Sequence, residues 1–211
     1  MKSTEFLNEG VVDAMEEMLV LIKRDCQPYL QQNKSALVEL PLWRGMNTGD
    51  EKDTRGPFRK KSVRLSDRIP KDTPQDIHDE LNFGLQKKYG HPYRNALFVT
   101  GAKGQTYNYG DAFIIFPIGH FEFIWHPDIR DLWDTIATAY SLDPRDSKIP
   151  NETMDKITYF MLKADYQTTN LEKAISNRGE IMMWCKSYYA INALMFGGLW
   201  ERQAFEERLY E

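Results

Sequence analysis

The chain has 211 residues, 42% of them hydrophobic and 27% charged, a composition typical of one globular domain or at most two small ones. The formal net charge of -4 excludes a global positive field that would draw the protein to nucleic acid or an anionic membrane, although local charge can still do so. No window is apolar over the length of a transmembrane helix, and acidic residues near the N-terminus interrupt every apolar run that a signal peptide needs. We therefore expect a cytoplasmic protein with no membrane association, folded as a single domain over residues 1–211.

The N-terminal region, residues 1–33, is predicted to contain an amphipathic helix that packs on the rest of the domain. Its apolar residues recur at helical spacing: Leu7, Val11, Met15, Met18 and Ile22. Cys26 follows this pattern and Cys185 lies in a later apolar run, so both side chains are expected to be buried. With no secretory leader in the sequence, this favours free thiols in a reducing compartment.

A strand is predicted over residues 36–46, and it ends in an arginine followed by a glycine. The planar guanidinium of Arg44 can hold phosphate or carboxylate through two hydrogen bonds. Gly45 beside it would let a ligand approach the backbone closely. The alternative is a surface arginine followed by a turn.

Residues 47–71 are predicted to form a polar loop in which the sign of the charge is locally reversed. Its basic residues are Lys52, Arg55, Arg59, Lys60, Lys61, Arg64, Arg68 and Lys71, against only two acidic residues after Lys52. Such a segment could face phosphate groups or contact nucleic acid, with Phe58 as a stacking ring. It could equally be a solvated loop.

A helix is predicted to follow over residues 73–89. Thr73 can cap its start, and Pro74 suits its first position. Gly90 is expected to end it, because glycine readily adopts the left-handed backbone conformation found after helices.

The next apolar run, residues 95–101, is predicted to be a strand that ends in Thr100 and Gly101. Two further strands are predicted over residues 112–116 and 121–125, joined by a hairpin or a tight corner. The hydroxyl of Thr100 therefore stands at a strand end, as the guanidinium of Arg44 does in the first strand.

Polar residues on the second of these strands raise the question of a metal site. His120, Glu122 and His126 share one face of an extended chain by its two-residue period. A single strand would spread these three groups over about 20 Å, which is too far for one ion. We therefore expect no metal site and interpret them as polar residues of an edge strand.

Further helices are predicted over residues 128–140, 151–164, 169–175 and 199–211. Between the last two, Glu180 follows Gly179 and leads an apolar run as far as Ile191, which is predicted to be one buried strand. Glu180 is either the solvated first residue of that strand or a carboxylate where the buried scaffold meets a cleft.

Taken in chain order, Arg44, Thr100 and Glu180 each stand at a strand end beside a glycine. In this respect the sequence resembles the mono-ADP-ribosyltransferases of the arginine–serine/threonine–glutamate, toxin-like class. The matching motifs are Leu42-Trp43-Arg44-Gly45, Phe98-Val99-Thr100-Gly101 and Gly179-Glu180-Ile181-Met182-Met183. The stretch that ends in Tyr109 and Gly110, with the strand after it, resembles the middle section of that family.

The resemblance implies an α+β fold with a split mixed or antiparallel β-sheet and flanking helices, and it implies NAD as the substrate. Glu180 would stabilise the positive charge that develops on the ribose when the nicotinamide bond breaks. Arg44 would hold the diphosphate, and the Gly45 backbone would meet the nicotinamide amide. Thr100 would orient Glu180. The remaining residues implied for NAD binding are Phe98, Tyr107 and Tyr109.

The chain departs from the family pattern at two places that concern the acceptor and the second motif. Thr100 is a single hydroxyl where members often carry Ser-Thr-Ser, and Arg178 stands where members that modify arginine or asparagine carry Glu or Gln. We assign the macromolecular acceptor, protein or nucleic acid, to Arg178 and to the basic residues Arg59, Lys60 and Lys61. Two other functions remain open: an interaction protein without catalysis, and a metal-dependent hydrolase.

Overall fold

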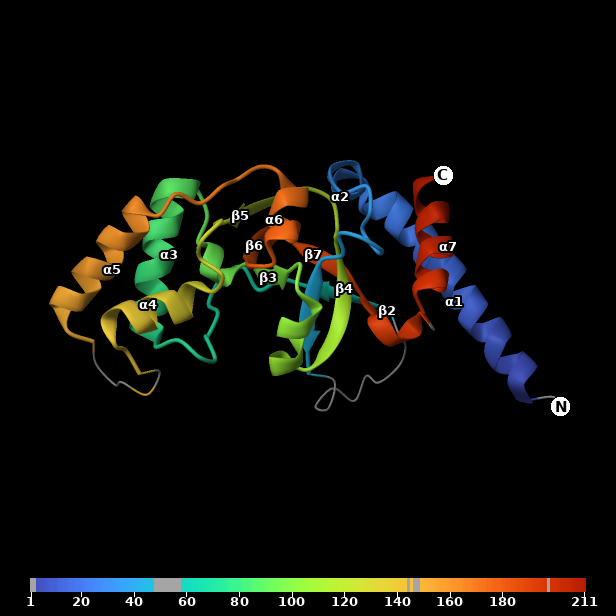
Figure 1. Ribbon diagram of the computed structural model, residues 1–211, viewed down its shortest axis with the longest axis horizontal. Helices are drawn as coiled ribbons and strands as arrows, with labels where there is room; N and C mark the ends of the chain where they lie inside the picture. Colours follow the sequence, from blue (N-terminus) through green and yellow to red (C-terminus); the bar gives the residue numbers. More distant parts are fainter. Residues whose placement is uncertain (1–2, 48–57, 144, 146–148, 197) are drawn as a thin grey trace.

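The computed structural model describes residues 3–47, 58–143, 145, 149–196 and 198–211, with side chains described from residue 14 onward. It is an α+β structure in which helices flank a seven-stranded sheet whose neighbouring strands are all antiparallel (Figure 1). The sheet order is β2-β7-β4-β1-β3-β6-β5.

The strands are β1 (Trp43–Met46), β2 (Phe58–Ser62), β3 (Leu97–Thr100), β4 (Asp111–Pro117), β5 (Phe121–Trp125), β6 (Glu180–Cys185) and β7 (Ser187–Asn192). The helices are α1 (Ser3–Asp25), α2 (Gln27–Gln32), α3 (Gln75–Tyr89), α4 (Leu132–Tyr140), α5 (Asn151–Lys163), α6 (Leu171–Asn177) and α7 (Leu199–Tyr210). Three short 3-10 helices are η1 (Tyr93–Asn95), η2 (Lys103–Tyr109) and η3 (Ala193–Met195).

The sheet is divided into two halves. A single register pair, Trp43 with Thr100, joins β1 to β3, whereas β1 pairs with β4 at four positions and β3 with β6 at four. We call β2, β7, β4 and β1 the first half, and β3, β6 and β5 the second half. Between the described strands the chain crosses from one half to the other four times: from β2 to β3, from β3 to β4, from β4 to β5 and from β6 to β7.

The protein has two apolar cores: the larger draws on strands of both halves of the sheet, and the smaller only on strands of the second half. In Figure 1, α1, α2 and α7 lie at one end of the molecule and α3, α4 and α5 at the other. The larger core holds fully buried rings such as Tyr29 and Phe116, which meet edge to face with centroids 5.6 Å apart. The smaller core is built by α3, α4 and α5 around Met182 of β6, with Ile77 and Ile157 fully buried in it.

The predicted strand over residues 180–191 is wrong in one respect, because it is two strands. Lys186 separates β6 from β7, and the two strands pair with different neighbours: β6 with β3 and β5, β7 with β4 and β2. Periodicity cannot reveal this change of partners, since both strands are buried on both faces. Of the two connections predicted between the strands of residues 112–116 and 121–125, the structure shows the tight corner and not the hairpin, because β4 and β5 are not neighbours in the sheet. Gly119 lies in this corner with φ 68°.

The first predicted strand, residues 36–46, is shorter than expected, and only Trp43–Met46 is extended in the sheet. The residues before it form turns because α7 satisfies their backbone: the Glu206 carboxylate accepts from the N–H groups of Leu37 and Val38 at 2.7 and 2.9 Å. Pro41, which has no N–H to give to a ladder, stands between the turns and β1.

The loop predicted over residues 47–71 is also corrected in part, since residues 58–62 form the edge strand β2 on β7. The ring of Phe58 is stacked on Tyr189 with centroids 4.8 Å apart, so it is packed rather than free to stack on a base. Lys52 and Arg55 lie outside the described residues.

Several sequence predictions are confirmed. The helix predicted over residues 73–89 ends at Gly90 as expected, with φ 88° at this left-handed cap, but it begins at Gln75 with Pro74 rather than Thr73 at the N-cap. Cys26 and Cys185 are both buried and free. None of the helices in the described part of the chain is long and apolar enough to cross a membrane.

Candidate functional site

Arg44, Thr100 and Glu180 lie on three neighbouring strands at the join between the two halves of the sheet. Thr100, the last residue of β3, pairs with Glu180, the first residue of β6. On its other side Thr100 pairs with Trp43, the residue before Arg44 in β1. Three segments far apart in the chain therefore meet in one row across the sheet.

The Arg44 guanidinium reaches from β1 across to β3. Its Nη1 donates a hydrogen bond to the carbonyl oxygen of Phe98 at 2.7 Å. Its Nε is buried and has no hydrogen-bond partner among the described residues. Arg44 is half-buried, so some of its guanidinium N–H groups face the protein and the rest of the group is exposed to solvent.

Gly45 is required by protein packing, because the protein itself fills the space that its missing side chain leaves. A Cβ at this position would lie 2.2 Å from the carbonyl oxygen of Thr106 and 2.8 Å from the Cβ of Tyr109. The 3-10 helix η2 thus lies directly on β1, and only glycine fits beneath it. Gly101 is required in the same way, because a Cβ there would lie 1.8 Å from the carbonyl oxygen of Ile175.

Thr100 does not contact the Glu180 carboxylate, which corrects its implied role. Its hydroxyl lies 2.9 Å from Oε1 of Gln105 and 3.3 Å from the carbonyl oxygen of Arg178, and it accepts from the N–H of Ala102 at 3.1 Å. Arg178 precedes Glu180 by two residues. Thr100 therefore holds the backbone that leads into β6 rather than the acidic group itself.

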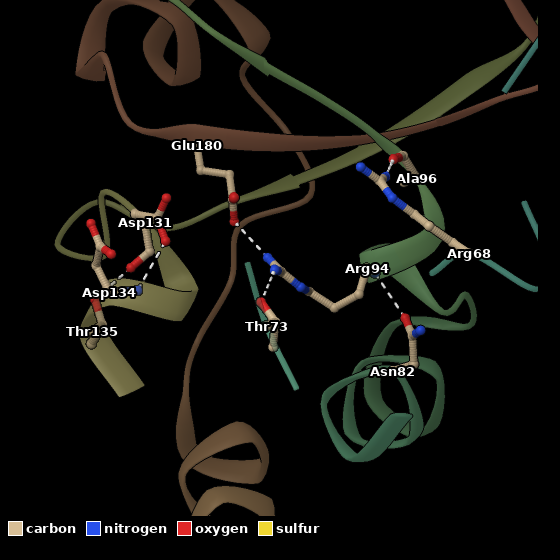
Figure 2. Close-up of polar contacts among 9 residues, drawn as sticks. All are labelled: Arg68, Thr73, Asn82, Arg94, Ala96, Asp131, Asp134, Thr135 and Glu180. Atoms are coloured by element: carbon tan, nitrogen blue, oxygen red, sulfur yellow. Dashed lines mark hydrogen bonds and ion pairs between the residues drawn. The ribbon is translucent and has the colours of Figure 1, made fainter. Parts of the chain in front are cut away.

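Glu180 is enclosed between an arginine and the start of a helix (Figure 2). Its Oε1 lies 3.4 Å from Nη1 of Arg94, and its side chain is 16% exposed. The carboxylate also lies near the backbone N–H of Leu132, the first residue of α4, where the helix dipole favours negative charge. Burial raises the pKa of Glu180 to about 7; Arg94 opposes this rise, while the neighbouring carboxylate of Asp131 adds to it.

Arg94 was missed by sequence reasoning, because nothing in the stretch between Gly90 and β3 distinguishes it from a surface arginine. Its backbone N–H donates to Oδ1 of Asn82 at 2.8 Å, which fixes η1 to α3. Its guanidinium lies over the ring of Phe98, 4.8 Å from the centroid. Only 7% of the residue is exposed.

Arg68 approaches the same ring. Its guanidinium lies 4.6 Å from the centroid of Phe98, and its Nη1 donates to the carbonyl oxygen of Ala96 at 2.6 Å. Burial lowers the pKa of Arg68 to about 10, and the positive charges of Arg44 and Arg94 lower it further while Glu180 opposes them. Phe98, which the resemblance implied as an NAD contact, is therefore covered by two guanidinium groups.

Both tyrosines implied for NAD binding lie on η2 and are exposed. Tyr107 is 65% exposed and Tyr109 is 55% exposed. Partial burial raises the pKa of Tyr109, and the nearby carboxylates, Glu180 among them, add to the rise. The phenol of Tyr109 thus lies close enough to Glu180 to sense its charge.

The residues assigned to the acceptor are not gathered in one place. Arg59 reaches over the ring of Phe113, the register partner of Arg44, at 5.5 Å. Lys60 instead approaches Tyr189 at 5.9 Å from the ring centroid, and it alternates with Arg59 and Lys61 along β2.

Arg178, the fourth residue assigned to the acceptor, is exposed at the C-terminal cap of α6, where it has φ 60°. It directly precedes Gly179 and β6. In the sheet order β6 is separated from β2 by four strands, so Arg178 and the basic edge strand belong to different parts of the molecule.

The three candidate metal ligands do not converge, because His126 is engaged elsewhere while His120 and Glu122 are in contact. Oε1 of Glu122 lies 3.3 Å from Nε2 of His91 and 3.4 Å from Nε2 of His120. The Nδ1 of His126 instead accepts from the N–H groups of Asp128 and Ile129 at 3.0 and 3.1 Å. The described residues contain no group of three or more His, Cys, Asp or Glu side chains that could hold a metal ion.

No protein-family model, no curated protein and no solved structure matches this chain.

Proposed function

We propose that the protein is a mono-ADP-ribosyltransferase, which cleaves NAD at the nicotinamide–ribose bond and transfers ADP-ribose to a protein or nucleic-acid acceptor. The observation that carries the proposal is the row formed by Arg44, Thr100 and Glu180 on β1, β3 and β6. The division of the antiparallel sheet at this row supports the finer proposal of an ADP-ribosyltransferase-like fold.

In the proposed reaction the bond between ribose C1′ and the nicotinamide nitrogen breaks, and its electron pair leaves with nicotinamide. The ribose then carries oxocarbenium-like positive charge, which an ionised Glu180 stabilises electrostatically. A nucleophilic group of the acceptor bonds to C1′ and releases its proton. Because the pKa of Glu180 is about 7, the active ionised form becomes dominant only above neutral pH.

Arg44 and Thr100 have supporting roles in this scheme. Arg44 holds the diphosphate of NAD, and its partly open, half-buried guanidinium suits that task. Thr100 acts on Glu180 indirectly, because its hydroxyl contacts the Arg178 carbonyl and so positions the turn before β6. It is a positioning residue.

A non-catalytic interaction protein is the second candidate, and one observation favours it. The Glu180 carboxylate already contacts the Arg94 guanidinium and lies near the Leu132 N–H, which would account for a buried carboxylate without any chemistry. This candidate requires that NAD is not consumed.

The experiment that separates the two incubates the protein with labelled NAD and mixed protein, RNA and DNA acceptors, and measures both nicotinamide release and label transfer. Glu180→Gln is expected to lower the rate about a thousandfold, the typical effect of removing one preorganised charge. Glu172→Gln, an exposed carboxylate on α6, is the matched control and should retain wild-type activity. Absence of nicotinamide release from the wild type, or full activity in Glu180→Gln, would refute the enzyme.

A further inference from the structure

Three guanidinium groups lie around Phe98, and the negative charge in contact with them does not balance their positive charge. Arg68 and Arg94 lie 4.6 and 4.8 Å from the centroid of its ring, and Arg44 donates to its carbonyl oxygen at 2.7 Å. Glu180 contacts this cluster through Arg94 at 3.4 Å. Since burial raises the pKa of Glu180 to about 7, even this compensation is incomplete at neutral pH.

The hydrogen bonds of Arg94 are poorer than a buried guanidinium requires. Its side-chain contacts are long, 3.4 Å to Glu180 and 3.5 Å to Oγ1 of Thr73, whereas charge-assisted bonds are typically about 2.7–2.9 Å. Its Nε, like that of Arg44, is buried with no partner within the described part of the chain. A buried charged donor without good acceptors is costly, so this arrangement favours an added anion.

Tyr166 provides an independent observation at the same place. It is 5% exposed, and its hydroxyl is buried without a hydrogen-bond partner among the residues described. Burial raises the pKa of Tyr166; the charge of Glu180 adds to the rise and that of Arg94 opposes it, so the phenol lies within electrostatic reach of both. A neutral hydroxyl donor within electrostatic reach of the Arg94 guanidinium suits an oxyanion.

The cluster can be reached from outside. Arg44, Arg68 and Phe98 are half-buried, and Arg68 also lines a shallow groove of about 730 Å³ between α3 and the segment before it. Two carboxylates, Asp67 and Asp79, line the same groove. A phosphate group is therefore favoured on the Arg68 side, and an uncharged part of the ligand elsewhere in the groove.

We propose that Arg68 and Arg94 join Arg44 in a binding site for the diphosphate group of a nucleotide. A diphosphate suits the cluster because its two linked phosphoryl groups can accept from three guanidinium groups at once. Identifying the nucleotide as NAD rests on the proposed function, but the anion site itself rests only on these contacts and charges. The anion shares Arg94 with Glu180, so the carboxylate competes with it.

The test is calorimetric titration of the full-length protein with inorganic pyrophosphate at constant ionic strength. Arg68→Gln and Arg94→Gln are each expected to weaken binding about tenfold or more, because each removes a charge-assisted donor. Glu180→Gln should tighten binding severalfold by removing the competing charge. Arg64→Gln, an exposed arginine of the same segment, is the control and should bind within about twofold of the wild type.

No binding of pyrophosphate to the wild type at millimolar concentration would overturn the site, as would equal affinities of Arg68→Gln and Arg64→Gln. If Arg94→Gln does not fold, as judged by circular dichroism, Arg68→Gln and Glu180→Gln decide the question. The outcome is separate from that of the proposed enzyme. If pyrophosphate binds with this pattern but the protein releases no nicotinamide from NAD, the anion site stands and the proposed enzymatic activity is rejected. If nicotinamide is released but Arg68→Gln does not change pyrophosphate binding, the enzymatic activity stands and the proposed anion site is rejected.

Discussion

The guanidinium of Arg94 lies 3.4 Å from the carboxylate of Glu180, and both side chains are largely buried. The contact joins η1, just before β3, to the first residue of β6 (Figure 2). It is longer than a strong ion pair, and Glu180 keeps a pKa of about 7 in spite of it. The carboxylate is therefore held at the boundary between its neutral and ionised forms near physiological pH.

The raised pKa of Glu180 should be visible in the pH dependence of the protein's stability. In the folded protein Glu180 has a pKa of about 7 against an ordinary value of 4.5, so between these values the folded state binds more protons than the unfolded state. The free energy of unfolding should therefore fall as pH rises from 4.5 to 7, by about 3 kcal/mol from this group. Urea denaturation at several pH values measures it. Glu180→Gln should remove this part of the slope, and an unchanged slope would contradict the raised pKa.

Replacing Arg94 should lower the stability of the fold most at pH values at which Glu180 is ionised. Arg94→Met leaves a buried carboxylate without its cation, which is expected to cost about 3 kcal/mol at pH 8 and less at pH 6. The pKa of Glu180 should rise further, which carboxyl carbon shifts in NMR spectra would report. The double variant Arg94→Met/Glu180→Gln should recover part of the loss. Strictly additive losses would show that the two groups do not interact.

Two glycines near β1 offer a matched comparison. Gly45→Ala should destabilise the fold by about 2–3 kcal/mol, because its Cβ would lie 2.2 Å from the Thr106 carbonyl and force η2 away from β1. Gly104→Ala, in η2 itself, meets nothing within 4 Å and should be close to neutral. Thermal denaturation of the two variants measures the difference. Equal stability would mean that η2 does not pack on β1 as described.

The hydroxyl group of Thr100 should contribute more to the stability of the fold than the packing of its side chain does. Thr100→Val removes the contacts to Gln105 and to the Arg178 carbonyl and leaves the Ala102 N–H without its acceptor, at an expected cost of about 1–3 kcal/mol. Thr100→Ser retains the hydroxyl and should lose less. Chemical denaturation compares the variants. A larger loss for serine than for valine would assign the role of Thr100 to packing.

Local sequence patterns determined the elements that depend on neighbouring residues. The helix of residues 75–89 and its end at Gly90 follow from spacing and from glycine's backbone freedom. The strand ends at Thr100 and Glu180 were also placed correctly, because each apolar run stops or begins there. The sequence alone also singled out Arg44, Thr100 and Glu180, by their order and their glycines.

Tertiary structure alone decided which groups meet at those strand ends. Arg94 and Glu180 are 86 residues apart, and no local pattern encodes their contact, since it depends on the pairing of β3 with β6 and on the docking of η1 on α3. The same holds for the hydroxyl of Thr100, which meets a backbone carbonyl instead of a carboxylate. Periodicity shows whether a residue faces a core, but charge, burial and pKa depend on what the rest of the chain brings beside it.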